Sequence, residues 1–390
     1  AIAYLETYQI TKDKRFSGVA EEVLAYILRD MTAPQGGFYS AEDADSEGVE
    51  GKFYIWTKPE IITVLGQGDG ERFCRRYDIT EQGNFEGKNI PNLIAGTPEP
   101  EDAFIQTCKQ ALFAEREKRI HPFKDKKILV SWNGLMIAAM AKAGRILHRT
   151  EYTEAAENAL RFIDRNMLRE DGRLLSSYSD GSSKTPGFVD DYAFLIWGLT
   201  ELYETTYRPE YLHKALEWNG DLIARFRDEA GGLFINGSDS EQLITRPKEY
   251  YDGAMPSGNS VAAMNFLRLS RLTGLPELEE YTQEQFRVFG GSMSKMPLSQ
   301  AYLLSAFLYS VSKSREIVLS GDDTAEMQNL INSEFMPFTG TVVYTNELNG
   351  ILQHGESYQS KDNKPKAFVC ENFTCKPPVS TTEELKELLQ

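Results

Sequence analysis

The stretch that decides the fold is Trp132 to Leu147, WNGLMIAAMAKAGRIL, which is apolar almost all round. A helix of this kind is buried on every side. The stretch that follows, Tyr152 to Leu168, has alanine, leucine and isoleucine on one face and charged residues on the other. That pattern is typical of an amphipathic surface helix. We therefore predict an inner helix covered by an outer one.

The same alternation recurs along the chain. Tyr192 to Tyr203 is again apolar all round, and an amphipathic stretch from Leu212 to Phe226 follows it. Ser260 to Leu272 predicts a further inner helix, Leu278 to Phe289 an outer one and Leu298 to Val311 another inner one. Alternating inner and outer helices predict an (α/α) toroid, whose inner helices begin at one mouth of the ring.

A stacked solenoid of helices is the alternative fold. The polar residues that begin successive inner helices, Asn133, Asp191 and Asn259, are 58 and 68 positions apart. Tetratricopeptide and HEAT repeats have shorter periods of roughly 34 to 47 residues. The spacing therefore favours the toroid.

Two segments interrupt the helical pattern. Residues 36–98 are rich in turns and contain a strand-like stretch, Lys52 to Trp56. After Lys313 we expect strands and helices to mix: strands at Arg315–Ser320, Thr341–Tyr344 and Ala367–Cys370, and helices at Asp323–Phe335 and Thr382–Leu389. We predict a toroid over residues 1–313, with an excursion at 36–98, and a small α/β lobe over residues 314–390.

The composition limits the partners. The 390 residues carry 42 basic and 58 acidic side chains, a net charge of −16. Nucleic acids and anionic membranes are bound by clustered basic faces, and the basic runs of this chain are interrupted by acids. Four cysteines fit a reducing compartment. We expect a cytoplasmic protein with no nucleic-acid or membrane partner.

The densest polar segment includes Asp43 and Asp45. Together with Glu47 and Gly48 they imitate the start of a calcium loop, but Tyr54 stands where an EF-hand has its bidentate glutamate. Two other interpretations are a solvated acidic turn and an ordered loop whose carboxylates act as general acid or base. As catalytic candidates we take Asp43 and Asp45.

A second pair of carboxylates, Asp190 and Asp191, begins an inner helix. One of them is expected to cap the helix, while the other faces the cavity. Glycosidases use two carboxylates roughly 5 to 9.5 Å apart, so Asp43 or Asp45 opposite Asp190 or Asp191 is the predicted catalytic pair.

Other polar or aromatic residues also begin inner helices. Trp132 suits stacking on a sugar face, although it suits core packing equally well. The remaining candidates have a simple capping explanation, because Ser, Asp and Asn stabilise helix N-termini. The predicted substrate-binding residues are Trp132, Asn133, Asp252, Ser257 and Asn259.

Signals for metals and cofactors are weak. None of the four histidines falls at the start of an inner helix, and no nucleotide-binding or serine-hydrolase motif is present. Cys370 and Cys375 form a CxxxxC motif, which indicates zinc or redox function less well than it indicates two ordinary thiols. We predict no metal and no cofactor.

Several motifs resemble a known family. They are GGFYSAEDADSEG (36–48), EGKFYIWT (50–57), GNFEGKN (83–89), WNGLM (132–136), DDYA (190–193), PSGNS (256–260) and the CxxxxC followed by Pro377–Pro378. In this order they resemble the YyaL-type, spermatogenesis-associated protein 20 family.

The resemblance implies an (α/α)6 toroid similar to six-hairpin glycosidases and N-acylglucosamine 2-epimerases, with a carbohydrate-type cavity. It also implies a preceding thioredoxin-like domain and an HFEKMLYD motif, neither of which this chain contains. Ala1 is therefore expected to lie inside an inner helix of an N-terminally truncated ring.

Two functions follow as hypotheses. The first is a glycoside hydrolase or sugar isomerase that uses the carboxylates named above. The alternative is a non-catalytic ligand-binding or scaffold toroid that partners the thioredoxin-like domain.

Overall fold

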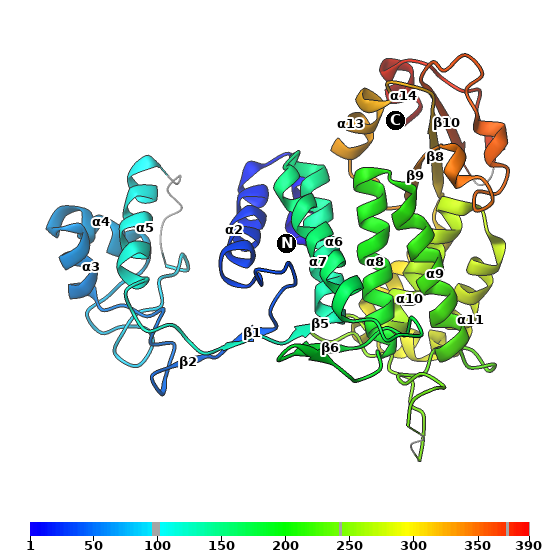
Figure 1. The fold of residues 1–390 in the computed structure, drawn as a ribbon. Coiled ribbons are helices and arrows are strands. Elements are labelled where there is room, and N and C mark those ends of the chain that lie inside the picture. Colours follow the sequence, from blue (N-terminus) through cyan, green and yellow to red (C-terminus); the bar gives the residue numbers. More distant parts are fainter. Residues whose placement is uncertain (96–101, 242–243, 372–373, 390) are drawn as a thin grey trace. The chain divides into compact units, whose positions relative to one another are not determined.

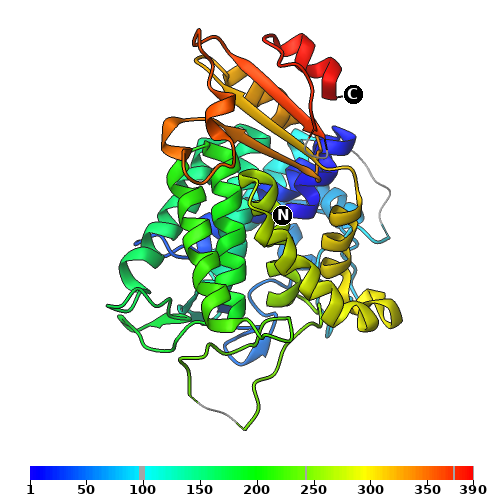
Figure 2. The ribbon, with the colours of Figure 1, turned by 90° about the vertical axis from the view of Figure 1, so that its right-hand side faces the viewer.

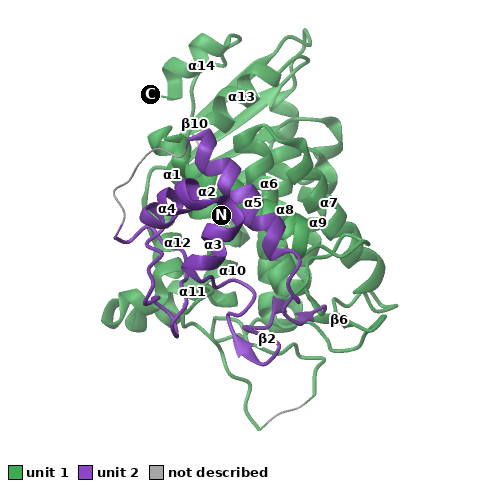
Figure 3. Cartoon of the chain, turned by 90° about the vertical axis from the view of Figure 1, so that its left-hand side faces the viewer, with its two compact units in different colours: residues 1–40, 127–390 green, residues 41–126 purple. Residues whose placement is uncertain are grey.

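The computed structural model describes residues 1–95, 102–241, 244–371 and 374–389. The end of the predicted excursion, residues 96–98, lies outside the described residues. The described chain forms two compact units, shown in Figure 3. Residues 1–40 and 127–390 form the helical unit, and residues 41–126 form the inserted unit.

Inner and outer helices alternate in the helical unit (Figure 1). The inner helices are α1 (Ile2–Thr11), α6 (Val130–Leu147), α8 (Val189–Thr206), α10 (Gly258–Thr273) and α12 (Ala301–Val311). The outer helices are α2 (Lys14–Asp30), α7 (Thr150–Asn166), α9 (Pro209–Phe226) and α11 (Pro276–Lys295). This is the inner and outer helix arrangement of an (α/α) toroid, and the predicted mainly α fold class is confirmed.

Two glycines allow α6 and α8 to pack closely. A Cβ atom on Gly134 would lie 2.5 Å from the carbonyl carbon of Phe194, and one on Gly198 would lie 2.9 Å from the carbonyl oxygen of Gly134. Both contacts are shorter than van der Waals distance. Glycine at both positions therefore sets the separation of these two inner helices.

The C-terminal residues of the helical unit combine strands with helices, and their separation as a lobe after residue 313 stays a prediction. Their sheet has the order β11–β10–β8–β9, in which only β8 and β9 are parallel. The strands are β8 (Arg315–Ser320), β9 (Thr339–Val343), β10 (Lys366–Glu371) and β11 (Thr374–Cys375), and the helices are α13 (Ala325–Ser333) and α14 (Thr382–Leu389). Figure 2 shows the sheet crossing one end of the inner helices. Short 3-10 turns occur at Pro297–Gln300, Asn346–Leu348 and Gly355–Tyr358.

The two cysteines of the CxxxxC motif are joined in a disulfide rather than remaining as thiols. Cys370 on β10 and Cys375 on β11 lie directly opposite each other in an antiparallel pair. Because this register brings the two sulfur atoms together, the expectation of two ordinary thiols is wrong.

The inserted unit has its own core around Trp56, Ile61 and Phe73. Its helices are α3 (Lys58–Leu65), α4 (Gln67–Arg76) and α5 (Ala103–Arg116), and its strands are β1 (Ala41–Glu42), β2 (Asp45–Ser46), β3 (Val49–Glu50) and β4 (Lys124–Asp125). In the helical unit, β5 (Ile128–Leu129), β6 (Ser177–Ser179) and β7 (Ser182–Ser183) form a further small sheet.

The predicted strand at Lys52–Trp56 is wrong, because Lys52 to Tyr54 form turns and only Trp56 pairs, in an isolated bridge with Asn89. Arg119 Nη1 donates hydrogen bonds to the carbonyl oxygens of Phe53 (2.9 Å) and Ile55 (2.8 Å). A neighbouring strand would need those carbonyl groups.

Among the described residues, no helix has the length and apolar composition needed to cross a membrane.

Candidate functional site

The predicted site residues of the helical unit gather where α6, α8 and α10 begin, an end that we call the mouth. Asp191 lies in the first turn of α8 and is only 2% exposed. Its Oδ1 accepts a hydrogen bond from the Ser131 N–H (2.9 Å) and its Oδ2 from the Phe188 N–H (2.8 Å). The Ser176 side chain adds a third. Asp191 therefore ties α8 to the start of α6.

Asp190 ties α8 to the opposite neighbour. Its carboxylate accepts a hydrogen bond from the Gly258 N–H at the start of α10. Partial burial raises the pKa of Asp190 above its ordinary value, the bond from Gly258 partly offsets this rise, and the negative charge of Glu249 adds to it. Burial also raises the pKa of Asp191, to about 6, against the effect of its three hydrogen bonds.

Sequence reasoning missed Glu249, which belongs to an irregular segment before α10. Its Oε1 accepts hydrogen bonds from the N–H groups of Tyr250 (2.9 Å) and Tyr251 (2.7 Å). Glu249 is exposed, and its charge acts on Asp190. The mouth therefore holds two neighbouring carboxyl groups, Asp190 and Glu249, one partly buried and one exposed.

Asn133 and Asn259 have equivalent structural roles. The amide of Asn133 bonds both backbone groups of Phe38, at 2.8 and 3.0 Å. The amide of Asn259 bonds both backbone groups of Leu233, at 2.7 and 2.9 Å. Each asparagine is at most 1% exposed and anchors the apolar residue that follows a Gly-Gly turn. Both amides are fully used in holding the backbone.

Asp252 and Ser257 also act on the backbone. Asp252 accepts hydrogen bonds from the N–H groups of Ser257 (2.9 Å) and Tyr302 (2.8 Å), which connects the start of α10 to α12. Ser257 caps α10 by accepting a hydrogen bond from the Ser260 N–H (3.2 Å). Of the predicted binding residues, Trp132 has the largest free surface, with 40% of its area exposed.

Asp43 and Asp45 belong to the inserted unit and are exposed. Asp45 begins a two-stranded hairpin in which it pairs with Glu50. Its N–H donates a hydrogen bond to Asp43 Oδ1 (3.0 Å). A hairpin replaces the helix-flanked loop of an EF-hand. The calcium-loop alternative is therefore not supported by the local fold.

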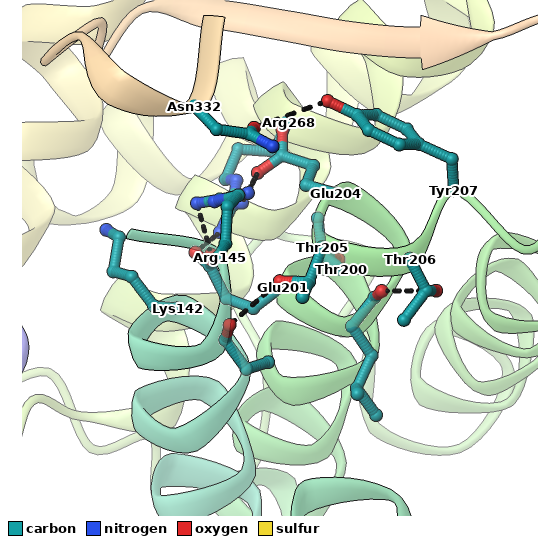
Figure 4. A network of polar contacts seen from close by, with 12 residues as sticks. Lys142, Arg145, Thr200, Glu201, Glu204, Thr205, Thr206, Tyr207, Arg268 and Asn332 are labelled. Carbon is teal, nitrogen blue, oxygen red and sulfur yellow. Dashed lines mark hydrogen bonds and ion pairs between the residues drawn. The ribbon is translucent and has the colours of Figure 1, made fainter. Parts of the chain in front are cut away.

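A second polar cluster, also missed from the sequence, lies toward the other end of the inner helices (Figure 4). Glu201 and Glu204 on α8 each contact both Arg145 of α6 and Arg268 of α10. Two acidic residues in an otherwise apolar inner helix were the available signal, since buried charges are almost always paired. This cluster lines a cavity of about 580 Å³.

The fold and the mouth define a helical protein of the toroid class. No family profile matches the chain. The chain is 28% identical over its whole length to human spermatogenesis-associated protein 20 and 29% identical to the rat protein, covering 56% of each. An uncharacterised protein of Caenorhabditis elegans is 28% identical over 99% of the chain. The resemblance stated from the motifs is confirmed, and the chain spans just over half the length of these relatives.

The chain also has a weak likeness to solved structures of carbohydrate enzymes. The match to cellobiose 2-epimerase from Spirochaeta thermophila covers 42% of this chain and 43% of the epimerase chain, with 21% identity and a TM-score of 0.35. A GH76 α-mannanase from Bacteroides thetaiotaomicron covers 84% of this chain and 85% of its own, with 12% identity and a TM-score of 0.41.

Proposed function

We propose that the helical unit acts on a carbohydrate-type substrate at the mouth, as a glycoside hydrolase or sugar isomerase, with Asp190 as the acid/base residue. The observation that carries this proposal is the position of Asp190, a half-buried carboxyl group in the first turn of α8 that accepts a hydrogen bond from the Gly258 N–H; burial and the charge of Glu249 raise its pKa. A carboxyl group whose pKa lies closer to neutrality retains its proton longer and can donate it to a leaving oxygen.

Glu249 is the second carboxylate of the proposal. Glycoside hydrolysis needs a general acid together with a carboxylate that acts as nucleophile or base. Asp191 is less suited to that task because three hydrogen bonds already occupy it. We assign Asp191 to positioning Asp190. The pairing of Asp43 or Asp45 with Asp190 stays a prediction, since those residues belong to the other unit.

Trp132 is the proposed sugar contact. Its exposed indole stands in the first turn of α6, next to Ser131, whose N–H binds Asp191. An exposed aromatic ring at the same end of the inner helices as these carboxyl groups suits a ligand with one apolar face and many hydroxyl groups. Asn133, Asp252, Ser257 and Asn259 contribute by fixing the backbone around it.

Turnover of a panel of glycosides and free sugars tests the proposal. Asp190→Asn preserves the acceptor for the Gly258 N–H but cannot release a proton, so we expect activity to fall at least 100-fold. Glu249→Gln should cause a comparable loss, whereas Trp132→Ala should mainly raise KM. Asp180→Asn, in the exposed β6–β7 turn, is the matched control and should retain full activity. Equal activity in wild type and Asp190→Asn would overturn the assignment.

The alternative function is a non-catalytic ligand-binding or scaffold module for a thioredoxin-like domain. It is favoured by the second cluster, whose carboxylates are bound to arginine side chains. Binding of a sugar from the panel, without turnover of any of them, would support this alternative. The cytoplasmic location is likewise still a prediction, which fractionation of cells would test.

A further inference from the structure

The cavity of about 580 Å³ lies inside the helical unit, away from the mouth. All five inner helices line it, together with residues from the segment 331–341, which runs from the end of α13 into β9. Along α8, Asp190 and Glu201 are eleven residues apart, which is about 16 Å in a helix. Its volume is within the range of about 300 to 1,000 Å³ that is typical of small-molecule sites.

The charged groups of the cavity form a closed ring of four. Glu201 accepts from Arg268 Nη1 (2.8 Å) and Arg145 Nη2 (3.0 Å). Glu204 uses one oxygen, Oε2, for Arg268 Nη2 (2.7 Å) and Arg145 Nη1 (3.2 Å). Among the described residues, no hydrogen bond reaches the other oxygen of Glu204. Trp197 Nε1 donates to Glu201 Oε1 at 3.3 Å and holds the indole against the ring of charges.

Every charged group that lines the cavity has a partner of opposite charge, and one of these partners, Lys12, lies outside the lining. Besides the ring of four, Lys142 of α6 pairs with Glu6 of α1. The half-exposed Glu334 pairs with Lys12 at 3.8 Å. Each cation therefore has an anion beside it, and a charged ligand would leave one charge uncompensated in a partly buried space. The electrostatics favour a neutral ligand.

The rest of the wall combines apolar surface with hydroxyl groups. Trp197 and Tyr302 have ring centroids 5.2 Å apart, and Met264 also lines the cavity. Burial raises the pKa values of Tyr302 and Tyr309, so both phenols remain protonated and can donate hydrogen bonds at neutral pH. The cavity thus offers aromatic faces beside a dense set of donors and acceptors.

We propose that this cavity is a separate binding site for a neutral, hydroxyl-rich small molecule, a sugar or polyol. The aromatic pair takes the C–H face of the ligand, and the ligand hydroxyls bond Glu204 Oε1, Lys142 and the Tyr302 phenol. The site is distinct from the carboxyl pair of the mouth and does not depend on catalysis there.

Calorimetric titration tests the site directly. The probes are glucose, maltose and sorbitol as neutral ligands, with gluconate and glucosamine as charged counterparts. We expect a neutral probe to bind at least tenfold more tightly than either charged one. Titration of the Asp190→Asn variant should give the same affinities, so failure of the proposed function at the mouth would not affect this result.

Two variants locate the ligand. Ser305 of α12 is exposed and lines the cavity, so Ser305→Phe should fill it and abolish binding. Ser294→Phe, on the exposed face of α11, is its control. Tyr302→Phe should weaken binding about fivefold through loss of one hydrogen bond. Tyr281→Phe on α11, outside the cavity, should leave binding unchanged.

The charge argument has its own test in Glu204→Gln. This variant leaves one unpaired positive charge in the cavity, so the preference should reverse and gluconate should bind more tightly than glucose. A thermal melt confirms that the variant is folded, and Glu157→Gln on α7 is the control. Absence of binding by all five probes, or an unchanged preference in folded Glu204→Gln, would overturn the proposal and leave the ring of charges with a structural role only.

Discussion

Replacing Glu201 with glutamine would measure how strongly the ring of charges holds the inner helices together. The Glu201 side chain is only 2% exposed and contacts Arg268 at 2.8 Å and Arg145 at 3.0 Å. Glutamine keeps the shape but removes the charge. Two buried guanidinium groups then share the single carboxylate of Glu204.

The expected loss is large. Removing one member of a buried ion pair costs about 3 to 5 kcal/mol, because the remaining charge stays desolvated. The glutamine oxygen can still accept a hydrogen bond from one arginine, so we expect the free energy of unfolding to fall by about 3 kcal/mol. Urea denaturation at pH 7, followed by tryptophan fluorescence, measures this as a lower midpoint at unchanged slope.

The pH dependence gives a second reading of the same variant. Burial alone would raise the pKa of Glu201, but Arg268, Lys142 and Arg145 hold it well below its ordinary range. The carboxylate therefore stabilises the fold above the unfolded-state pKa of about 4.3, and this contribution is lost as pH falls toward the folded-state value. The stability difference between wild type and Glu201→Gln should shrink only below about pH 4.

The matched control is Glu157→Gln on α7. Glu157 pairs with Arg161 and Arg208, whose side chains are 49% and 43% exposed. Glu157 itself is 14% exposed, but solvent screens both arginine side chains; such pairs contribute about 1 kcal/mol or less, so the control should lose no more than that. Similar small losses in both variants would refute the reasoning.

Three further predictions concern packing, protonation and the disulfide. Gly134→Ala should destabilise the protein by about 1 to 3 kcal/mol, since its Cβ would meet the backbone of α8 at 2.5 Å. Gly220→Ala, whose Cβ would have nothing within 4 Å, should stabilise the protein by about 1 kcal/mol in the same denaturation assay. The carboxyl group of Asp191 has a folded-state pKa of about 6, above its ordinary value, so its ionisation should lower the free energy of unfolding by up to about 3 kcal/mol as pH rises from 4 to 7. A carboxyl NMR titration with a midpoint at or below pH 4 would contradict this. Replacing Cys370 and Cys375 with serine opens a short loop and should lower the free energy of unfolding by about 2 kcal/mol, which a lower melting temperature would show. A reducing agent should lower the melting temperature of the wild type but not that of the serine variant.

The sequence predicts the helical part of the fold well because its signal is local. An all-round apolar stretch such as Trp132–Leu147 identifies an inner helix without any knowledge of its neighbours, and the strand Arg315–Ser320 was likewise predicted with its observed bounds. The stretch Lys52–Trp56 has the local pattern of a strand, but its carbonyl groups bind Arg119, more than sixty residues further along. Local pattern carries no information about such a partner.

The candidate site was only partly predictable for the same reason. Asn133 was expected as a polar residue at a helix start, but its bonds to Phe38 join residues 95 positions apart. Glu249 was missed because only the folded chain brings its charge to Asp190. Glu201 and Glu204, by contrast, could have been found, since two acids in a buried helix require cationic partners.

The origin of the cavity walls has a consequence for the order in which the protein assembles. Gln9 of α1 donates hydrogen bonds to the carbonyl oxygens of Asn332 (2.9 Å) and Glu334 (3.1 Å), across more than 320 residues of sequence. Neighbouring helix pairs such as α6–α7 and α8–α9 need only short loops to close. Contacts between distant segments form slowly because loop closure must come first. In refolding, helix formation should therefore precede the appearance of the cavity, and ligand binding should be among the last properties recovered.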